Sequence, residues 1–514
     1  MTLQKLLVFT LLSFLICSTT YSSTITNQDK NPDNLSSNFN VTDYGAVGDG
    51  ITLNTTAFQS AIDACANSGG GTVVIPSGIY LSGTIVLKNN ICLHFEHNAT
   101  LLGSTRHEDF PLQPLPKYRS HKDKAGGFYA LIYAEGATNI ALTGTGTING
   151  QGKNQIPRAN PKAGDIDGRP RSILFISCKF VRVEGLRINA SGVWNQHYLN
   201  CEDVVVDKIS VYNHVNRNND AIDIDGCRRF TLSNSIFDTD DDGITLKSTG
   251  AAPCENIAIT NCIVSSFCNA IKAGTESTGG FRNITISNCV IKPSISKEVP
   301  VFNTPRIGIT GISLEIVDGG TMEGVTISNI TIEGTQCPLY IRLGNRARKH
   351  TEGVSEPGLG TMKNISISNI VAYKTGNFSS SITSFPGSYI ENISLNNIQF
   401  FNEGGLQKGD YIETIDGVKE DEKGYPQPTA WENLPSSVLF IRHAKNVIIN
   451  GLMAGSNNED PRIPIIAHDV EGLSIKNSLI VQGNTANTFF MGKDISIFEV
   501  EKPLGWKGQV TNIE

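Results

Sequence analysis

The sequence lacks an excess of basic residues. It carries 42 Lys+Arg against 49 Asp+Glu, a net charge of −7, whereas proteins that bind nucleic acid show basic stripes. We therefore predict no nucleic-acid partner. Charged residues make up only 18% of the chain and hydrophobic residues 39%, a composition that fits neither a highly charged disordered protein nor a membrane protein.

Long apolar runs are also missing beyond residue 22. No later segment has the roughly 18 uninterrupted apolar residues that a transmembrane helix needs. Residues 1–22 combine a basic start, the apolar run Leu6–Ile16 and small polar residues, the pattern of a cleavable secretory signal. A competing interpretation makes Cys17 a bacterial lipid-anchor cysteine, although isoleucine is a poor residue before such a cysteine. We expect a secreted or periplasmic protein with a flexible leader over 23–38 and no membrane span.

Metal-binding cysteine patterns are absent as well. The chain has 11 cysteines but no Cys-x-x-Cys pair, so their spacing fits no zinc site. An exported protein can oxidise its cysteines. Cys262 and Cys289, however, fall at equivalent positions of a repeat and are as compatible with stacked buried thiols as with a disulfide. We predict no disulfide pairing, no metal site and no cofactor.

The internal repeat of the sequence lacks a helical period of 3.6 residues, which excludes helical repeats such as ankyrin or tetratricopeptide arrays. Glycine is abundant, at 50 of 514 residues, and it marks frequent turns. In place of a helical pattern, one motif recurs, in which alternating apolar residues are followed by Asn or Gly. Copies include FTLSN (230–234), NIAITN (256–261), NITISN (283–288) and NISISN (364–369). The closer copies follow one another at about 25 residues, and wider gaps indicate insertions.

Alternation with period two predicts strands with one buried face. A repeat of short strands and turns predicts a solenoid, in which each coil buries its apolar face on the next. We therefore predict an all-β protein, a single-domain right-handed parallel β-helix over 39–514, although the length alone would allow three domains. Stacked coils would place Asn above Asn in amide ladders. The first coil needs a cap, and 55–67 supplies a helix with Thr55 or Thr56 as its N-cap.

Four consecutive coils have comparable strand starts, NNDAIDID (218–225), DDDGITLK (240–247), CNAIKAG (268–274) and ITGISLE (309–315). Aligning their apolar positions makes one inward column of Ile222, Ile244, Ile271 and Ile312. In this register Asp220 stacks on Asp242 at the turn that enters the strand, and Asp241 lies beside them. Because neighbouring coils lie about 4.8 Å apart, the three aspartates form one acidic patch.

The acidic patch has two other interpretations. A run of aspartates in a turn is usually a solvated loop, and clustered carboxylates also suit Ca²⁺. Two features favour a catalytic site. The carboxylates come from adjacent coils at one angular position, and Lys247 and Lys272 lie beside them. Carboxylates held close together raise at least one pKa, as a proton-donating acid requires.

These residues resemble family 28 of the glycoside hydrolases, which includes polygalacturonases and rhamnogalacturonan hydrolases. The opening VTDYGAVGDG…GGGTVVIPSGIYLSG (41–83) is similar to the N-terminal signature of pectin-acting β-helix enzymes. The family's Asn-Thr-Asp motif matches Asn218-Asn219-Asp220, and its Gly-Asp-Asp motif matches Asp240-Asp241-Asp242. Lys247 matches a lysine that is common in the same strand.

The resemblance implies an inverting glycoside hydrolase that acts on galacturonate-containing pectic polysaccharide. Asp241 would be the general acid that protonates the leaving oxygen, and Asp220 and Asp242 would hold and activate water. Inverting pairs are typically about 6.5–9.5 Å apart. The partner would be an acidic polysaccharide, and we expect a monomer. No electrophilic metal is implied.

The sequence departs from the family at two motifs. The usual Gly-His-Gly aligns with Cys268-Asn269-Ala270, and the usual Arg-Ile-Lys with Ser313-Leu314-Glu315. The Arg and Lys that bind a substrate carboxylate are therefore missing. Glu315 stands in place of the Lys and is expected to face outward and repel a carboxylate, so a neutral sugar such as rhamnose is expected at that subsite. The residues expected to bind substrate instead are Asn218, Lys247, Asn269, Lys272 and Arg342. Two interpretations of Arg342, Arg346 and Arg348 stay open: they bind an acidic sugar, or they form a solvated basic loop.

Insertions at 105–130, 290–310, 346–362 and 400–435 are long enough to wall a cleft. The last contains Tyr425 and Trp431, which either stack on sugar or pack the loop. Two other functions stay open beside the hydrolase. One is a polysaccharide lyase that uses calcium and a basic residue, and the other is a non-catalytic carbohydrate-binding protein or adhesin. Retention of all three aspartates favours the hydrolase.

Overall fold

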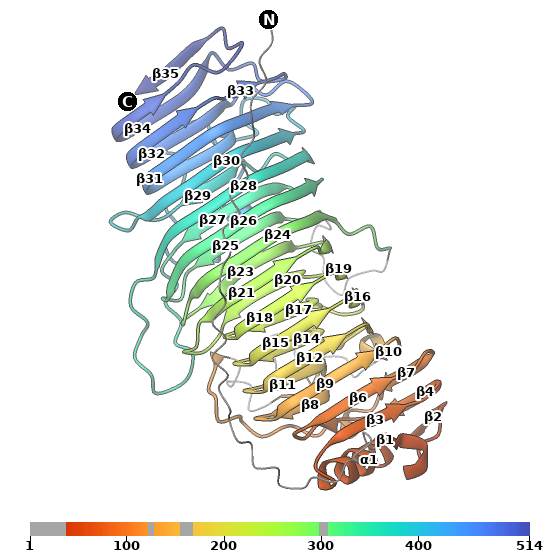
Figure 1. The fold of residues 1–514 in the computed structure, drawn as a ribbon. Coiled ribbons are helices and arrows are strands. Elements are labelled where there is room, and N and C mark those ends of the chain that lie inside the picture. The colour runs from red at the N-terminus through yellow and green to blue at the C-terminus, as the bar shows by residue number, and fades with distance from the viewer. Residues whose placement is uncertain (1–37, 122–127, 155–167, 298–306, 514) are drawn as a thin grey trace, which may run out of the picture.

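The computed structural model describes residues 38–121, 128–154, 168–297 and 307–513. The predicted signal over 1–22, Cys17 and all but the last residue of the leader lie outside this range. Within it, no helix is both long and apolar enough to cross a membrane. The described chain is almost entirely β-strand, and the strands follow one another as a stack of coils from the α1 end to the β35 end (Figure 1).

The strands form three parallel stacks, in which each strand pairs with its counterpart one coil away. The first stack holds β1 (Asn38–Asn40), β3 (Gly71–Ile75), β6 (Ile91–Phe95), β9 (Thr138–Gly144), β12 (Lys179–Glu184), β15 (Glu202–Asp207), β18 (Arg228–Ser233), β21 (Cys254–Thr260), β24 (Phe281–Pro293), β26 (Thr321–Glu333), β28 (Thr361–Thr375), β30 (Ile390–Asn402), β31 (Ser436–Ser456), β32 (Ile463–Lys476) and β34 (Thr488–Val500).

The second stack runs beside it and takes in the last residues of five long strands, β24, β26, β28, β30 and β31. Its own members are β2 (Asp49–Leu53), β4 (Gly78–Ser82), β7 (Ala99–Gly103), β10 (Thr147–Asn149), β13 (Arg187–Asn189), β16 (Ser210–Asn213), β19 (Ile236–Thr239), β22 (Ile263–Ser266) and β33 (Leu479–Ile480).

The third stack carries the predicted site and is called the site stack. It holds β5 (Ile85–Val86), β8 (Ala130–Glu135), β11 (Arg171–Ile176), β14 (Gln196–Leu199), β17 (Ile222–Asp225), β20 (Ile244–Ser248), β23 (Asn269–Ser277), β25 (Thr310–Ile316), β27 (Cys337–Leu343), β29 (Ser380–Thr383) and β35 (Gln509–Ile513). The first residues of β31, β32 and β34 complete it between β29 and β35. This arrangement confirms a parallel β-helix.

Period-two alternation places the apolar residues of each strand in one core that runs the length of the coils. At the bends, asparagines adopt the left-handed conformation, with φ of 52° at Asn234 and 55° at Asn261, which short polar side chains tolerate. The Asn261 amide donates to Asn234 Oδ1 at 3.2 Å, and the Asn329 amide donates to Asn288 Oδ1 at 3.1 Å. The predicted asparagine ladders are therefore confirmed.

The predicted capping helix is present as α1 (Thr55–Asn67), whose side chains Phe58, Ile62 and Cys65 are buried against the first coil. The predicted N-cap is wrong, since Asn54 holds that position. Thr55 Oγ1 instead accepts a hydrogen bond from the Gly83 amide at 2.7 Å. The threonine is therefore used to tie the helix to the neighbouring coil.

All ten described cysteines are free. Cys262 and Cys289 are buried and lie on adjacent coils, where the Val290 amide donates to the Cys262 carbonyl. Of the two arrangements that the sequence left open, stacked thiols are the one present.

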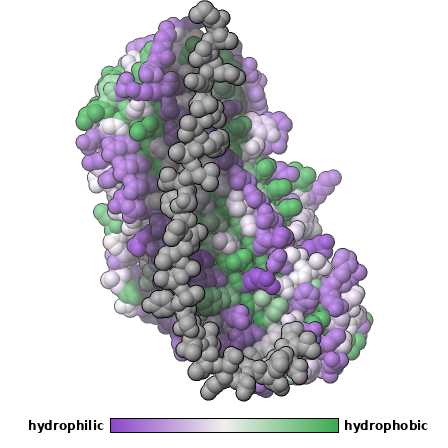
Figure 2. Space-filling model, in the orientation of Figure 1, coloured by the Kyte–Doolittle hydropathy of each residue, from purple (hydrophilic) through white to green (hydrophobic). Residues whose placement is uncertain are grey.

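Short 3-10 turns interrupt the connections between strands, namely η1 (Val41–Tyr44), η2 (His107–Asp109), η4 (Gly152–Asn154) and η6 (Pro428–Ala430). The longest described connection, 403–435, returns along the outside of the site stack, because its residues contact strands from β23 to β31. Polar and apolar residues are interspersed over the face seen in Figure 2.

Candidate active site

The predicted register of the site stack is confirmed. Ile222 pairs with Ile244, and Ile244 pairs with Ile271. The Ala221 amide donates to the Asp242 carbonyl at 3.1 Å, so Asp220 and Asp242 occupy equivalent positions on adjacent coils. Asp220 precedes β17, and Asp242 precedes β20, with Asp241 beside it. The fold therefore brings the three predicted catalytic residues together.

Asp242 is held as an anion. It is only 4% exposed, and its Oδ1 accepts a hydrogen bond from the Asn269 amide at 2.7 Å. Lys272 Nζ lies 3.2 Å from Oδ2. Burial raises the pKa of Asp242, but Lys272 and Lys247 outweigh it, and the pKa is lowered below its usual value. At neutral pH this carboxyl is ionised.

The pKa of Asp241 is shifted in the opposite direction. Its Oδ1 accepts a hydrogen bond from the Asp242 amide at 3.0 Å, and its Oδ2 lies 3.4 Å from the Asn218 amide. Burial and the charge of Asp242 raise the pKa of Asp241 to about 6, against the attraction of the two lysines. Two neighbouring carboxyl groups thus have pKa values that are pushed apart, as a general acid and a general base require.

Asp220 lies deeper, at 3% exposure. Burial, together with the charges of Asp223 and Asp241, raises its pKa well above the usual value. Its Oδ1 has no hydrogen-bond partner among the described residues. The pKa of Asp220 is therefore shifted in the direction opposite to that of Asp242, although the sequence predicted one role for both.

Two predicted substrate-binding residues are already engaged in ion pairs. Lys272 contacts Asp242, as described. Lys247 Nζ lies 3.6 Å from both Asp223 Oδ1 and Glu276 Oε2 and 4.7 Å from the centre of the Trp194 ring. Both ammonium groups therefore tune the carboxylates of the site.

Asn269, a third predicted substrate-binding residue, also contacts a carboxylate of the site. Its side-chain amide donates to Asp242, and its Oδ1 accepts a hydrogen bond from Thr310 Oγ1 at 2.7 Å. The amide is therefore oriented by the next coil, and it fixes the position of the Asp242 carboxylate.

A cavity of about 410 Å³ opens beside Asp241, a size typical of small-ligand sites. Asp220 and Asp242 are not among the residues that line it. The lining residues are Arg217, Asn218, Asp240, Asp241, Phe267, Cys268, Ile307, Ile309, Gln427 and Thr429. Of the predicted site residues, Asp241 and Asn218 thus face this cavity directly.

Several lining residues were missed from the sequence. Arg217 had a signal, because it directly precedes Asn218 in the first family motif. Gln427 and Thr429 had none, because they belong to the 403–435 connection and reach the cavity only when it folds back. Tyr425 comes from the same connection, and its hydroxyl lies 3.5 Å from Lys272 Nζ. The predicted role of this insertion as a wall is confirmed.

Two side chains of the protein, Ser313 and Glu315, bind each other where the family has the Arg and Lys that bind the substrate carboxylate. Glu315 is 1% exposed, so the expectation that it faces solvent and substrate is wrong. Ser313 Oγ donates to Glu315 Oε1 at 2.6 Å. Burial raises the pKa of Glu315 to about 7, against the attraction of Lys272. At neutral pH this carboxyl is therefore only partly charged.

Arg342 lies outside the cavity lining. It is 3% exposed and donates hydrogen bonds to the carbonyls of Ser384, Glu420 and Asp421 at 2.8 Å. Its guanidinium also lies 5.1 Å from the centre of the Trp431 ring. Trp431 is buried with it, so of its two predicted roles the loop-packing one is present. Arg342 anchors the 403–435 connection.

The expectation of a solvated basic loop at 346–348 is also wrong. Arg346 and Arg348 both bind the buried Asp318 carboxylate, with N–O distances of 2.5 and 2.9 Å. Arg348 also pairs with Glu276 at 3.2 Å. A chain of ion pairs therefore runs from the predicted basic loop to Lys247.

One group of side chains among those described has the spacing of a metal site. Oxygen atoms of Asp241 and Asp242 and the Cys268 sulfur lie within 4.8 Å of one another. The Lys272 ammonium already neutralises Asp242 at 3.2 Å, which opposes a cation at this point. The geometry therefore does not favour the calcium alternative.

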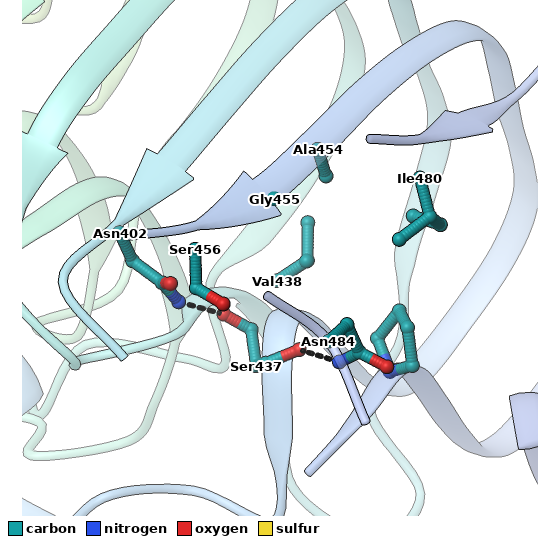
Figure 3. Close-up of a pocket in the computed structure, with 9 residues that line it drawn as sticks. Asn402, Ser437, Val438, Ala454, Gly455, Ser456, Ile480 and Asn484 are labelled. Carbon is teal, nitrogen blue, oxygen red and sulfur yellow. Dashed lines mark hydrogen bonds between the residues drawn. The ribbon is translucent and has the colours of Figure 1, made fainter. Parts of the chain in front are cut away.

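A second, much smaller cavity of about 10 Å³ lies between the last coils. Figure 3 shows Asn402 and Asn484 hydrogen-bonded to Ser437 at its edge. This volume is enough for about one water molecule. It is therefore too small for a sugar.

Comparison with known proteins identifies the family. The family model described as "Glycosyl hydrolases family 28" matches residues 65–416. A probable polygalacturonase of Vitis vinifera is 30% identical over 254 residues, which are 46% of this chain and 51% of the relative. An exo-poly-alpha-D-galacturonosidase of Dickeya chrysanthemi is 28% identical over 249 residues, 40% of this chain and 41% of the relative. The chain therefore matches about half the length of these curated relatives, or less.

A solved structure supports the same fold. The exopolygalacturonase of Thermotoga maritima superposes with a TM-score of 0.59 at 22% identity, covering 82% of this chain and 93% of that one. At this identity the likeness concerns the fold alone, and it confirms the predicted right-handed parallel β-helix.

Proposed function

The chain belongs to glycosyl hydrolase family 28, and we propose that it hydrolyses glycosidic bonds in galacturonate-containing pectic polysaccharide. The relatives from Vitis vinifera and Dickeya chrysanthemi are named a probable polygalacturonase and an exo-poly-alpha-D-galacturonosidase, and these names support this substrate class. The observation that carries the proposal is the adjacent pair of Asp241 and Asp242, whose pKa values are shifted in opposite directions.

Each aspartate has a separate role in this proposal. Asp241 faces the cavity, is protonated below about pH 6 and donates its proton to the leaving glycosidic oxygen. Asp242, ionised beside Lys272, takes a proton from the attacking water. Asp220, whose pKa is raised well above its usual value, orients that water by a hydrogen bond. General acid and base assistance of this kind contributes about 10²- to 10⁴-fold each.

We propose an inverting outcome, on the strength of the family resemblance. The oxygens of Asp241 and Asp242 lie within 4.8 Å of each other, closer than the roughly 6.5–9.5 Å typical of inverting pairs, so the separation of this pair does not carry the assignment. Nuclear magnetic resonance of the first product formed tests it. The new reducing end should have the configuration opposite to that of the cleaved bond, and retention of configuration would contradict the proposal.

A rhamnogalacturonan-type hydrolase is the second candidate. It is favoured by the Ser313–Glu315 pair, which fills the place of the family's carboxylate clamp. The apolar residues Phe267, Ile307 and Ile309 line the cavity as well, and they suit a neutral sugar. Initial rates on homogalacturonan and on a chain of alternating uronate and neutral sugar separate the candidates. A preference of tenfold or more for homogalacturonan would exclude the second.

The lyase alternative needs a neutral basic residue to remove a proton from the sugar. Burial lowers the pKa of Lys272, but its carboxylate neighbours outweigh this and raise the pKa well above its usual value. Lys247 is shifted in the same direction for the same reason. Both lysines are therefore fully protonated and unsuited to act as bases. An unsaturated product absorbing in the ultraviolet would nevertheless establish a lyase.

We also propose that the protein is exported and acts as a monomer. The apolar segment within 1–22 supports export, since it has the pattern of a signal peptide. Fractionation of the producing cells and N-terminal sequencing of the mature protein test export. Light scattering of the purified protein tests the oligomeric state.

A further inference from the structure

The 403–435 connection places a neutral amide in the cavity beside Asp241. Gln427 and Thr429 line this cavity together with Asp241 itself, although they follow it far along the chain. Gln427 is half-buried and Thr429 is exposed, so a molecule that enters the cavity can reach both. The connection therefore contributes polar groups next to the proposed general acid, in addition to forming a wall.

The side chain of Gln427 is oriented by its neighbour. Thr429 Oγ1 donates a hydrogen bond to Gln427 Oε1 at 3.2 Å, which leaves Nε2 as the end of the amide that can donate. Nε2 lies 4.0 Å from Cys268 Sγ, and a cysteine sulfur is only a weak acceptor. Because an amide nitrogen carries two N–H groups, Gln427 can donate a stronger hydrogen bond to a molecule in the cavity.

The backbone that carries Gln427 is fixed in place. Gln427 is the N-cap of η6, and its carbonyl accepts a hydrogen bond from the Ala430 amide at 2.9 Å. Trp431, directly after η6, is buried, and its indole nitrogen donates to the Lys419 carbonyl at 3.2 Å. A side chain presented from an ordered segment loses less conformational freedom when it binds a ligand.

The surroundings of Gln427 favour an uncharged acceptor. Asp240 and Asp241 line the same cavity, and ionised aspartates repel an anionic group placed close to them. The hydroxyl groups of a sugar are uncharged and have acceptor lone pairs. Phe267 and Ile309 also line the cavity, and apolar side chains of this kind suit the C–H face of a sugar ring. A sugar hydroxyl is therefore the group that matches the Gln427 amide.

We propose that Gln427 binds a hydroxyl group of the sugar next to Asp241 by donating from Nε2, and that Thr429 is a positioning residue that holds the amide in this orientation. The inference rests on the proposed function, because it concerns the same cavity. Gln427 lies outside the sequence motifs that the chain shares with its family, so this contact comes from the insertion and not from the solenoid coils.

Binding is tested in an Asp241→Asn background, where no turnover disturbs it. Calorimetry measures the affinity for trigalacturonate and for a tetrasaccharide of alternating galacturonate and rhamnose. Gln427→Met keeps the length of the side chain but removes the donor, and it should weaken binding of the tighter ligand by about 3- to 10-fold. Gln407→Met, at an exposed position of the same connection, is the matched control and should leave the affinity unchanged.

Two further variants test the orientation and the placement of the amide. Thr429→Val should weaken binding less than Gln427→Met does, and it should add nothing in the Gln427→Met background, because both act through one hydrogen bond. Gln427→Glu in the wild-type protein puts another carboxylate in the cavity. Its charge should raise the pKa of Asp241 and move the basic limit of the kcat/KM profile upward, which a purely structural residue would not do.

An unchanged affinity of Gln427→Met for both oligosaccharides would overturn the inference, and so would an unshifted basic limit for Gln427→Glu. Additive losses from Gln427→Met and Thr429→Val would overturn the positioning role. Absence of binding of both oligosaccharides by the parent would overturn the contact as well. Failure of the proposed function is a separate outcome, since the wild-type protein would then turn over no pectic polymer while the oligosaccharides still bind in a Gln427-dependent way.

Discussion

Lys272 Nζ lies 3.2 Å from Oδ2 of Asp242, and both side chains are buried. The pair makes Asp242 the anion of the site, although it stands next to a second carboxyl group in the chain. Because like charges held close together disfavour each other, the ionised Asp242 helps to keep the proton on Asp241. In the proposed mechanism, the lysine thus divides the acid and base roles between two neighbouring residues without lining the cavity itself.

Asp241→Asn should lower kcat by about 10²- to 10⁴-fold, because the amide keeps the shape of the side chain but cannot donate the proton. Steady-state hydrolysis of the preferred pectic polymer measures the loss, with circular dichroism to verify the fold. Asp240→Asn is the matched control, since Asp240 precedes Asp241 on the same turn and also lines the cavity. It should cost less than tenfold. A near wild-type rate for Asp241→Asn would refute its role.

Activity should fall as the pH rises through about 6, because Asp241 must carry its proton and its pKa is raised to about 6. On the acid side, activity should persist below the usual aspartate value of 3.8, because the pKa of Asp242 is lowered from it. The pH profile of kcat/KM measures both limits for the free enzyme. A plateau extending to pH 8 would show that another group supplies the proton.

The raised pKa of Asp241 also predicts how the stability of the protein depends on pH. The pKa of Asp241 is about 6 in the folded protein against 3.8 for an ordinary aspartate, so the folded state binds this proton more tightly. Its contribution is favourable at low pH and is lost between these two values as the pH rises. Asp241→Asn removes this dependence. The melting temperature of the variant relative to wild type should therefore be higher at pH 8 than at pH 4, and an unchanged difference would contradict the burial of this charge.

Lys272→Met should shift the acid limit of the pH profile upward, because Asp242 loses its closest cation. It should also lower the free energy of unfolding by about 3–5 kcal/mol, the usual cost of leaving one partner of a buried ion pair. Denaturant titration measures the second effect. Lys179→Met, which breaks an exposed pair with Glu202, should cost less than about 1 kcal/mol. An unshifted acid limit would mean that Lys272 does not set the charge of Asp242.

Removal of divalent cations should leave the initial rate unchanged. The proposed mechanism uses carboxyl groups and water, and the Lys272 ammonium already neutralises Asp242. Assays with excess chelator, followed by addition of calcium, measure this. Loss of activity that calcium restores would instead favour the lyase alternative.

The sequence by itself determined the coil repeat and the register of the site stack. Period-two alternation fixes which side chains face inward, and the repeat aligns each coil with the next. Asp220 and Asp242 could therefore be placed one above the other, and Lys272 beside them. These are local rules that act within a coil or between neighbouring coils, so a linear pattern contains them.

Only the tertiary structure decided what covers the site. The 403–435 connection leaves a distant coil and folds back, which brings Gln427 to the cavity and covers Arg342. Neither the burial of Glu315 nor the anchoring role of Arg342 follows from the repeat, because a side chain that points outward from a solenoid strand is normally exposed. Burial then sets the protonation of the carboxyl groups. The sequence placed the residues along the stack, and the path of one long insertion determined which of them meet water, substrate or one another.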